Sequence, residues 1–168
     1  MKLIIINGPP GVGKSTVAEK LHKAVSLSYL LEIDALRRNI SNYREQVKES
    51  RELSYYVSLA IVEACFSAGS DVIIDKAISN STVMDRFFQV AKKYNANTYE
   101  FILNASKELV VKRAENRGYR TGGLLTPEKV ERWWEDTQEY IKKRPLAIVV
   151  NTETLSQNEV YKYIIDKL

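Results

Sequence analysis

The sequence contains very little cysteine and histidine, with one residue of each, Cys65 and His22. A single cysteine excludes an internal disulfide, and one cysteine with one histidine cannot build a Cys/His zinc cluster. This composition suits a reducing compartment, so we expect a cytoplasmic protein. Long apolar segments are also absent, because no segment approaches the roughly 18 residues that a membrane-spanning helix needs. We therefore expect a soluble chain without membrane contact.

Linker sequences are absent as well, because no segment is rich in proline or serine and no internal repeat is found. The 168 residues fall in the range of one domain, and the 45% apolar content is enough for a core. Lys and Arg outnumber Asp and Glu by 25 to 21, which suits ligands that carry phosphate groups. This excess is too mild to indicate nucleic acid. The sequence predicts one domain over residues 1–168.

Short apolar segments alternate with longer segments of helical period, which is typical of an α/β domain with a mainly parallel sheet. Strands are predicted at residues 3–6, 28–33, 72–74, 98–103 and 146–150. Apolar residues three and four positions apart predict helices around residues 17–25, 53–64 and 84–91. Further helices are predicted behind the N-cap candidates Ser106 and Thr126, and over residues 157–168.

Residues 8–15, Gly-Pro-Pro-Gly-Val-Gly-Lys-Ser, match the phosphate-binding pattern G-x-x-x-x-G-K-[ST] in full. A glycine turn that only joined a strand to a helix would not need the Gly-Lys-Ser ending. Lys14 would reach the β- and γ-phosphates, and the Ser15 hydroxyl would bind Mg²⁺. The motif predicts ATP and Mg²⁺ as cofactors, held by a loop of Gly8, Pro9, Pro10, Gly11, Val12, Gly13, Lys14, Ser15 and Thr16.

Asp34 and Arg37 are the candidate acceptor-binding residues. Asp34 follows the second predicted strand, and ligands of open α/β sheets bind beyond the carboxyl ends of the strands. A carboxylate there can orient an acceptor hydroxyl and accept its proton, and Arg37, one helical turn on, can hold an anionic group. In the alternative interpretation, Asp34 only caps the following helix and Arg37 lies on a solvated face.

Asp75 closes the third predicted strand and is the second candidate ligand of Mg²⁺. An acid at this position in P-loop proteins holds the metal or bonds to the loop hydroxyl. The alternative is a strand-terminal aspartate that only turns the chain. Lys76 beside it could contact a phosphate, although a lone lysine at the start of a loop is more often solvated.

Arginines gather before a glycine-rich segment at residues 118–123. Arg113 and Arg117 are four residues apart and so share one helix face, and Arg120 follows within the segment. Arginines on a closing lid can neutralise the charge that develops on a transferred phosphoryl group and exclude water. The alternative is a basic last turn that complements the helix dipole.

Together these motifs resemble the nucleoside-monophosphate-kinase-like group of P-loop kinases, which includes shikimate, gluconate and adenylylsulfate kinases, chloramphenicol phosphotransferase, zeta toxins and polynucleotide kinase domains. The resemblance implies a three-layer P-loop fold, with a five-stranded parallel sheet in the order 2-3-1-4-5 and helices on both faces. It also implies an acceptor-binding helical region at about residues 35–68, a lid at about 117–125, and an adenine site near residues 151–153.

The subfamily is not fixed by these motifs. The sequence lacks the glycine-rich segment that shikimate kinases carry after strand three, and Ser79-Asn80 comes later than the Thr-Asn of polynucleotide kinases. We expect transfer of the γ-phosphoryl group of ATP to a hydroxyl of a metabolite, nucleoside or polynucleotide, by a monomer or a homodimer. The alternatives are a nucleotide hydrolase and an ATP-binding switch without an acceptor.

Overall fold

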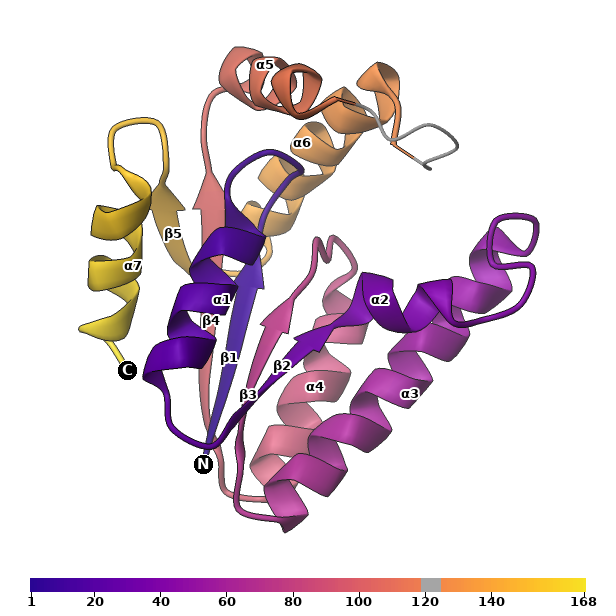
Figure 1. Ribbon diagram of the computed structural model, residues 1–168, viewed down its shortest axis with the longest axis vertical. Helices are drawn as coiled ribbons and strands as arrows, with labels where there is room; N and C mark the ends of the chain where they lie inside the picture. The colour runs from indigo at the N-terminus through magenta and orange to yellow at the C-terminus, as the bar shows by residue number, and fades with distance from the viewer. Residues whose placement is uncertain (119–124) are drawn as a thin grey trace.

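A five-stranded parallel sheet in the order β2-β3-β1-β4-β5 forms the centre of the computed structural model, which describes residues 1–118 and 125–168 (Figure 1). This order confirms the one that the resemblance implied. Each predicted strand is present. Their bounds are β1 Lys2–Asn7, β2 Ser28–Glu32, β3 Asp71–Asp75, β4 Asn97–Asn104 and β5 Ile148–Asn151.

Helices cover both faces of this sheet. Those in the described residues are α1 Lys14–Ala24, α2 Ile33–Arg38, α3 Val47–Ser67, α4 Ser81–Lys93, α5 Lys107–Arg117, α6 Pro127–Lys142 and α7 Gln157–Ile165. Helices α1 and α7 share a core with one face, and α3 and α4 share a core with the other. Helix α5 lies beyond the carboxyl ends of the strands and packs against α6 (Figure 1). None of the described helices has the length and apolar content to span a membrane.

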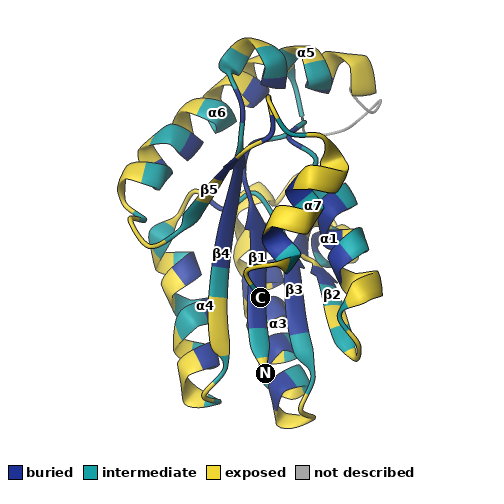
Figure 2. Cartoon of the chain, turned by 90° about the vertical axis from the view of Figure 1, so that its left-hand side faces the viewer, coloured by how far each residue is buried: buried dark blue, intermediate teal, exposed yellow. Residues whose placement is uncertain are grey.

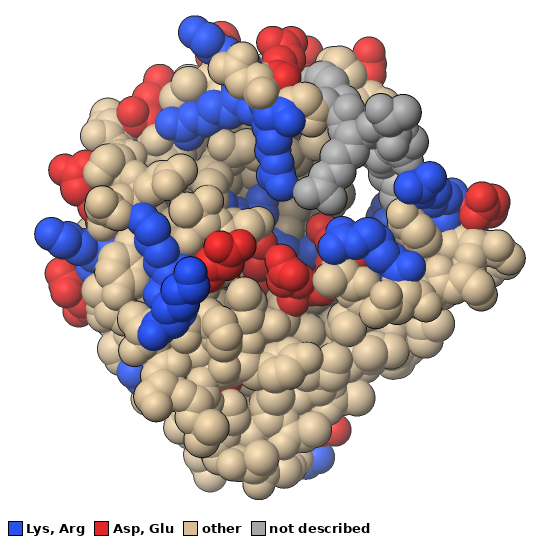
Figure 3. All heavy atoms as spheres, in the orientation of Figure 1, with Lys and Arg blue, Asp and Glu red and all other residues tan. Residues whose placement is uncertain are grey.

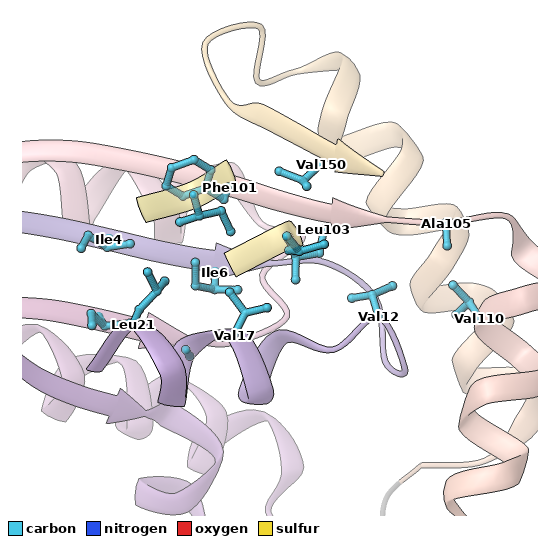
Figure 4. Close-up of a cluster of buried hydrophobic side chains, with 14 of the residues drawn as sticks. Ile4, Ile6, Val12, Val17, Leu21, Phe101, Leu103, Ala105, Val110 and Val150 are labelled. Carbon is cyan, nitrogen blue, oxygen red and sulfur yellow. The ribbon is translucent and has the colours of Figure 1, made fainter. Parts of the chain in front are cut away.

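The central strands are buried on both faces, as their continuous apolar sequences predict (Figure 2). Side chains alternate along a strand, so Ile4 and Ile6 pack toward α1 while Leu3 and Ile5 pack toward α3 and α4. Val12, from the phosphate-binding loop, joins the first of these cores (Figure 4). The loop is thereby anchored to the centre of the domain.

The ends of several elements differ from the sequence prediction. Leu146 was expected in the last strand, but it is 96% exposed and lies in a turn closed by a hydrogen bond from Ala147 N to Arg144 O. Ile33 was expected at the end of β2 and instead begins α2. Helix α7 ends at Ile165, three residues early. An apolar residue next to the end of a strand or helix looks the same in the sequence as one inside it, so the sequence does not fix where the strand or helix ends.

Helix α3 has the predicted period but a different buried face. Leu53, Tyr56 and Val57 are exposed, whereas Tyr55 and the serines at 50, 54 and 58 are buried. The hydroxyl of Ser58 donates to Ser54 O at 2.6 Å, and that of Ser54 to Arg51 O at 2.7 Å. Buried serines that satisfy their hydroxyls within their own helix occupy little space. They allow α2 to pack closely against α3.

Candidate active site

The phosphate-binding loop connects β1 to α1 through backbone conformations that require glycine. Gly8 has φ 135°, and a Cβ there would lie 2.2 Å from the carbonyl oxygen of Leu103. Gly13, the N-cap of α1, has φ 93°. The helix N-terminus that follows the loop presents backbone N–H groups, including those of Ser15 and Thr16, and helix N-termini of this kind favour anions, as the sequence motif predicts.

Asn7 anchors the loop and was missed by the sequence reasoning. Its side chain is buried, accepts hydrogen bonds from Gly8 N and Ile78 N, both at 2.8 Å, and donates to Ile78 O at 2.9 Å. It thus joins the start of the phosphate-binding loop to the segment after β3. The sequence did contain a signal for this role, because Asn7 is a polar residue at the end of an otherwise apolar strand, and a buried polar side chain needs hydrogen-bond partners.

Lys14 is folded back against its own loop, where its Nζ donates to Pro9 O at 2.9 Å. Loss of hydration lowers the pKa of Lys14 to about 8, against the opposing effect of the Asp75 and Asp34 carboxylates. The charges of Lys76 and Arg117 lower this pKa further. The residues predicted to act on the phosphates and the acceptor therefore lie within electrostatic range of one another.

Ser15 and Asp75 are the two residues that the sequence predicts for Mg²⁺. Asp75 pairs in register with Ile6 at the end of β1, and Ser15 lies in the first turn of α1. Mg²⁺ in nucleotide sites takes one or two protein oxygens and completes its shell with phosphates and water, so this sparse donor set fits the ion. A cluster of three acidic, His or Cys side chains is absent from the described residues, and such a site does not need one.

Asp34 does not cap the helix as the alternative interpretation required. The N-cap of α2 is Glu32, and Asp34 lies in the first turn with its carboxylate bonded to Nζ of Lys76. The side chain of Asp34 is 61% exposed, whereas that of Lys76 is 10% exposed. Partial loss of hydration acts to raise the pKa of Asp34, but the charge and hydrogen bond of Lys76 outweigh it and hold the pKa below the usual range. Asp34 is therefore an ionised group open to solvent.

Arg37 forms its hydrogen bonds inside the protein and is not open to solvent. It is buried, and it donates to Ser50 Oγ at 3.0 Å, Val47 O at 2.9 Å and Tyr43 O at 3.2 Å. Burial and the nearby charge of Arg51 both lower the pKa of Arg37. In this structure Arg37 holds the segment at residues 39–46 and the start of α3 in place.

Arg113 lies beside the phosphate-binding loop. It donates to Thr152 Oγ1 at 3.2 Å and to Thr152 O at 2.9 Å. Both residues line a cavity of about 380 Å³ with Gly11, Gly13, Val17 and residues 155–157 and 160. Thr152, which belongs to the segment that the resemblance implied for adenine, thus borders the same cavity as the phosphate-binding loop. The cavity has room for a nucleobase next to the phosphate site.

Arg117 is the last residue of α5 and is absent from the lining of that cavity. It is exposed, it forms no ion pair with a described residue, and its charge acts on Lys14. The rest of the predicted lid, including Arg120, lies at residues 119–124, outside the described residues. On the face of the molecule shown in Figure 3, basic and acidic side chains surround a hollow.

Comparison with known proteins identifies a family for this chain. The model of a family described as AAA domain matches residues 3–155. Adenylate kinase isoenzyme 1 of Gallus gallus is 27% identical over 151 residues, which cover 85% of this chain and 73% of the relative. The adenylate kinase of Clostridium tetani is 29% identical over 105 residues, covering 62% of this chain and 48% of that protein.

Solved structures share the fold at lower identity. A gluconokinase from Sinorhizobium meliloti 1021 superposes with a TM-score of 0.66 and 19% identity, covering 96% of this chain and 87% of that one. A deoxyadenosine kinase from M. mycoides gives a TM-score of 0.60 and 16% identity, covering 99% and 97%. At these identities the likeness shows the fold alone.

Proposed function

Because the chain belongs to the AAA domain family and has the fold of P-loop kinases, we propose that it transfers the γ-phosphoryl group of Mg·ATP to the hydroxyl of an acceptor. Lys14 would neutralise charge on the β- and γ-phosphates, and Ser15 with Asp75 would hold Mg²⁺. Mg²⁺ held there would supply charge neutralisation of the phosphate groups. Arg113 would bind beside the nucleobase, and Arg117 would meet the transferred group.

The observation that carries this proposal is the exposed, ionised carboxylate of Asp34 in the electrostatic range of Lys14. A hydroxyl acceptor must lose a proton during transfer, and an adjacent carboxylate can orient the hydroxyl and accept that proton. A hydrolase has no need of such a group beyond the carboxyl end of β2, in addition to the acid at the end of the neighbouring strand β3. Asp34 therefore supports an acceptor site distinct from the ATP site.

The adenylate kinase relatives favour a second candidate, in which the acceptor is the phosphate of a nucleoside monophosphate. A phosphate oxygen is already deprotonated and needs cations more than a base. The two candidates therefore differ in how strongly they depend on Asp34.

The test is incubation with γ-labelled ATP, Mg²⁺ and a panel of nucleosides, 5′-hydroxyl oligonucleotides, sugars, sugar acids, shikimate and nucleoside monophosphates. For a hydroxyl acceptor, Asp34→Asn should lower transfer by roughly 10²- to 10⁴-fold and change ATP affinity only a few-fold. Lys14→Ala should abolish transfer with the fold retained. Transfer to nucleotide phosphates that survives Asp34→Asn would favour the second candidate, and release of inorganic phosphate alone would indicate a hydrolase.

A further inference from the structure

Helix α3 exposes an apolar stripe along its outer face. Leu53, Tyr56 and Val57 are 48%, 59% and 40% exposed, and Ala60 and Ala64 are exposed as well. Spacings of three and four residues place these five side chains on one face of the helix, which we call the α3 stripe. A solvated helix face is normally polar, and a contiguous exposed apolar surface indicates a contact with another protein.

Packing inside the domain does not explain these apolar residues. Ser50, Ser54 and Ser58 fill buried positions in the same half of α3. The helix thus places large apolar side chains in water and small polar ones inside. Covering the stripe with a partner would remove its apolar surface from water, which is favourable.

A cavity of about 250 Å³ lies beside the stripe, between α3 and α4. It is lined by Leu59 of α3 and by Arg86, Gln89, Val90 and Lys93 of α4. The guanidinium of Arg86 lies 4.5 Å from the centroid of the Tyr56 ring, which places the cavity next to the stripe. A hole of this kind can accept a large side chain from a facing helix.

The basic residues of this face lie along the middle and the end of the stripe. Helices α3 and α4 lie side by side and run in the same direction (Figure 1). Lys93, at the end of α4, pairs with Glu63 near the end of α3 at 3.0 Å, and Arg86, two turns earlier on α4, lies over Tyr56.

The start of the stripe is acidic. Glu49 and Glu52 are exposed, lie one turn before Leu53 and Tyr56, and form no ion pair with another described residue. Lys48 and Arg51 also lie near this end, but their spacing places them on the other side of the helix, above the buried Tyr55. The face of α3 and α4 therefore changes from acidic to basic along its length.

We propose that the α3 stripe and the cavity beside it form the interface of a homodimer, in which the two copies of α3 pack antiparallel. A two-fold axis across α3 brings the acidic end of each copy against the basic end of the other, twice in the dimer. Lys93 contacts Glu63, and Val57 lies midway between Glu52 and Glu63. Val57 therefore lies near the axis, with Lys93 of one copy opposite Glu52 of the other. A parallel arrangement would bring like charges together.

The size of the face sets the strength of this contact. The 21 residues of α3, with α4 beside them, give a face of about 30 Å by 20 Å. Two copies would bury about 1,200 Å² in total, which is at the lower limit for stable interfaces. We therefore expect a reversible dimer with a dissociation constant in the micromolar range. The residues assigned to ATP and to the acceptor lie outside this face, so the proposal does not rest on the function proposed above.

Sedimentation velocity on the full chain, from about 1 to 200 µM, tests the dimer. The mean mass should rise from 19.2 kDa toward twice that value as the concentration increases. Val57→Glu and Ala60→Glu should each weaken the dimer at least tenfold, because they place like charges near the axis. Both should keep the wild-type melting temperature at 1 µM, since the side chains that they replace are exposed. The matched control Val149→Glu replaces a valine of β5 that is 45% exposed and should dimerise as the wild type does.

Charge reversal tests the antiparallel arrangement. Lys93→Glu should weaken the dimer at least tenfold, because Glu52 of the second copy would then face Glu63 and a new carboxylate. Adding Glu52→Lys to this variant restores opposite charges across the interface. The double variant should therefore regain the wild-type dissociation constant to within about threefold.

Each outcome decides part of the proposal. A mass of 19.2 kDa at every concentration would overturn it and leave the stripe to a partner of another kind. A dimer that neither Val57→Glu nor Ala60→Glu weakens lies on another face and would also overturn it; if Val57→Glu unfolds the chain, Ala60→Glu decides. Loss of the dimer in Lys93→Glu without recovery in the double variant would overturn the antiparallel packing. A dimer with these properties that transfers no label from ATP would reject the proposed function and leave the interface standing.

Discussion

Lys76 donates a hydrogen bond from its Nζ to the carboxylate of Asp34 and so ties the end of β3 to the first turn of α2. The two residues follow neighbouring strands of the parallel sheet, since Glu32 at the end of β2 pairs in register with Asp75 at the end of β3. The acid that would orient the acceptor and the acid that would hold Mg²⁺ are therefore linked through one lysine. The sequence alone favoured a solvated Lys76 over a Lys76 that contacts a phosphate, and it did not indicate the bond to Asp34.

Lys76→Met should weaken transfer more at acidic pH than at neutral pH. The lysine keeps the pKa of Asp34 below its usual range against the effect of burial, so its removal lets Asp34 protonate at a higher pH. Transfer needs the carboxylate, and we therefore expect the acidic limb of kcat/KM to move to higher pH. A steady-state pH profile measures this. Lys93→Met, which removes an exposed partner of Glu63, is the control and should keep the wild-type profile.

Arg113 and Arg117 should affect different kinetic constants. Arg113 borders the nucleotide cavity and bonds to Thr152, so Arg113→Ala should weaken ATP binding about tenfold with a small change in kcat. Arg117 is unpaired among the described residues and acts on Lys14, so Arg117→Ala should lower kcat by roughly 10²- to 10³-fold and leave ATP affinity within a few-fold. ATP titration and saturation kinetics on both variants test this division. Equal losses in both constants for both variants would contradict it.

The sheet and the phosphate-binding loop could be predicted because their signals are local. The apolar strands, the Gly-Lys-Ser ending and the Thr126 cap each lie within a few consecutive residues, and the structure contains all three. The cap at Ser106 was right only in position, because its hydroxyl bonds to Glu153 instead of the helix backbone.

Contacts between distant segments could not be predicted in this way. Asn7 bonds to Ile78, 71 residues away, and Lys76 to Asp34, 42 residues away. The burial of Arg37 also depends on how α2 packs against α3. The spacing Asp-x-x-Arg gives no information about that packing. The same limit explains the first half of α3, where Leu53, Tyr56 and Val57 of the predicted apolar face are exposed and three serines are buried.

Asn7→Ala should destabilise the protein and weaken ATP binding together. The change removes three hydrogen bonds at a buried site and leaves the Gly8 and Ile78 groups without partners, at a cost of about 2 to 4 kcal/mol. Urea denaturation and ATP titration measure the two effects. Asn80→Ala is the control, because it removes one N-cap bond of α4, worth about 1 kcal/mol, and leaves the phosphate-binding loop intact.

Tyr140 should make the stability of the fold depend on alkaline pH. Its hydroxyl donates to Glu100 Oε1 at 2.6 Å in the core beneath α6, and Arg144 pairs with the other oxygen of Glu100 at 3.0 Å. Burial, and then the hydrogen bond and charge of Glu100, raise the pKa of Tyr140 far above its usual range. The folded protein therefore keeps this proton at pH values where the unfolded chain, with a pKa near 10, loses it.

The sign of the effect follows from proton binding. Above pH 10 the folded state binds more protons than the unfolded state, so the stability contributed by Tyr140 is complete below pH 10 and is lost as the pH rises beyond it. Tyr140→Phe lacks this proton. The wild type should therefore lose about 1.3 kcal/mol of unfolding free energy relative to Tyr140→Phe between pH 9 and pH 11. Chemical denaturation of both proteins at each pH gives this difference, and a difference that stays constant with pH would show that the pKa of Tyr140 is not raised in the folded protein.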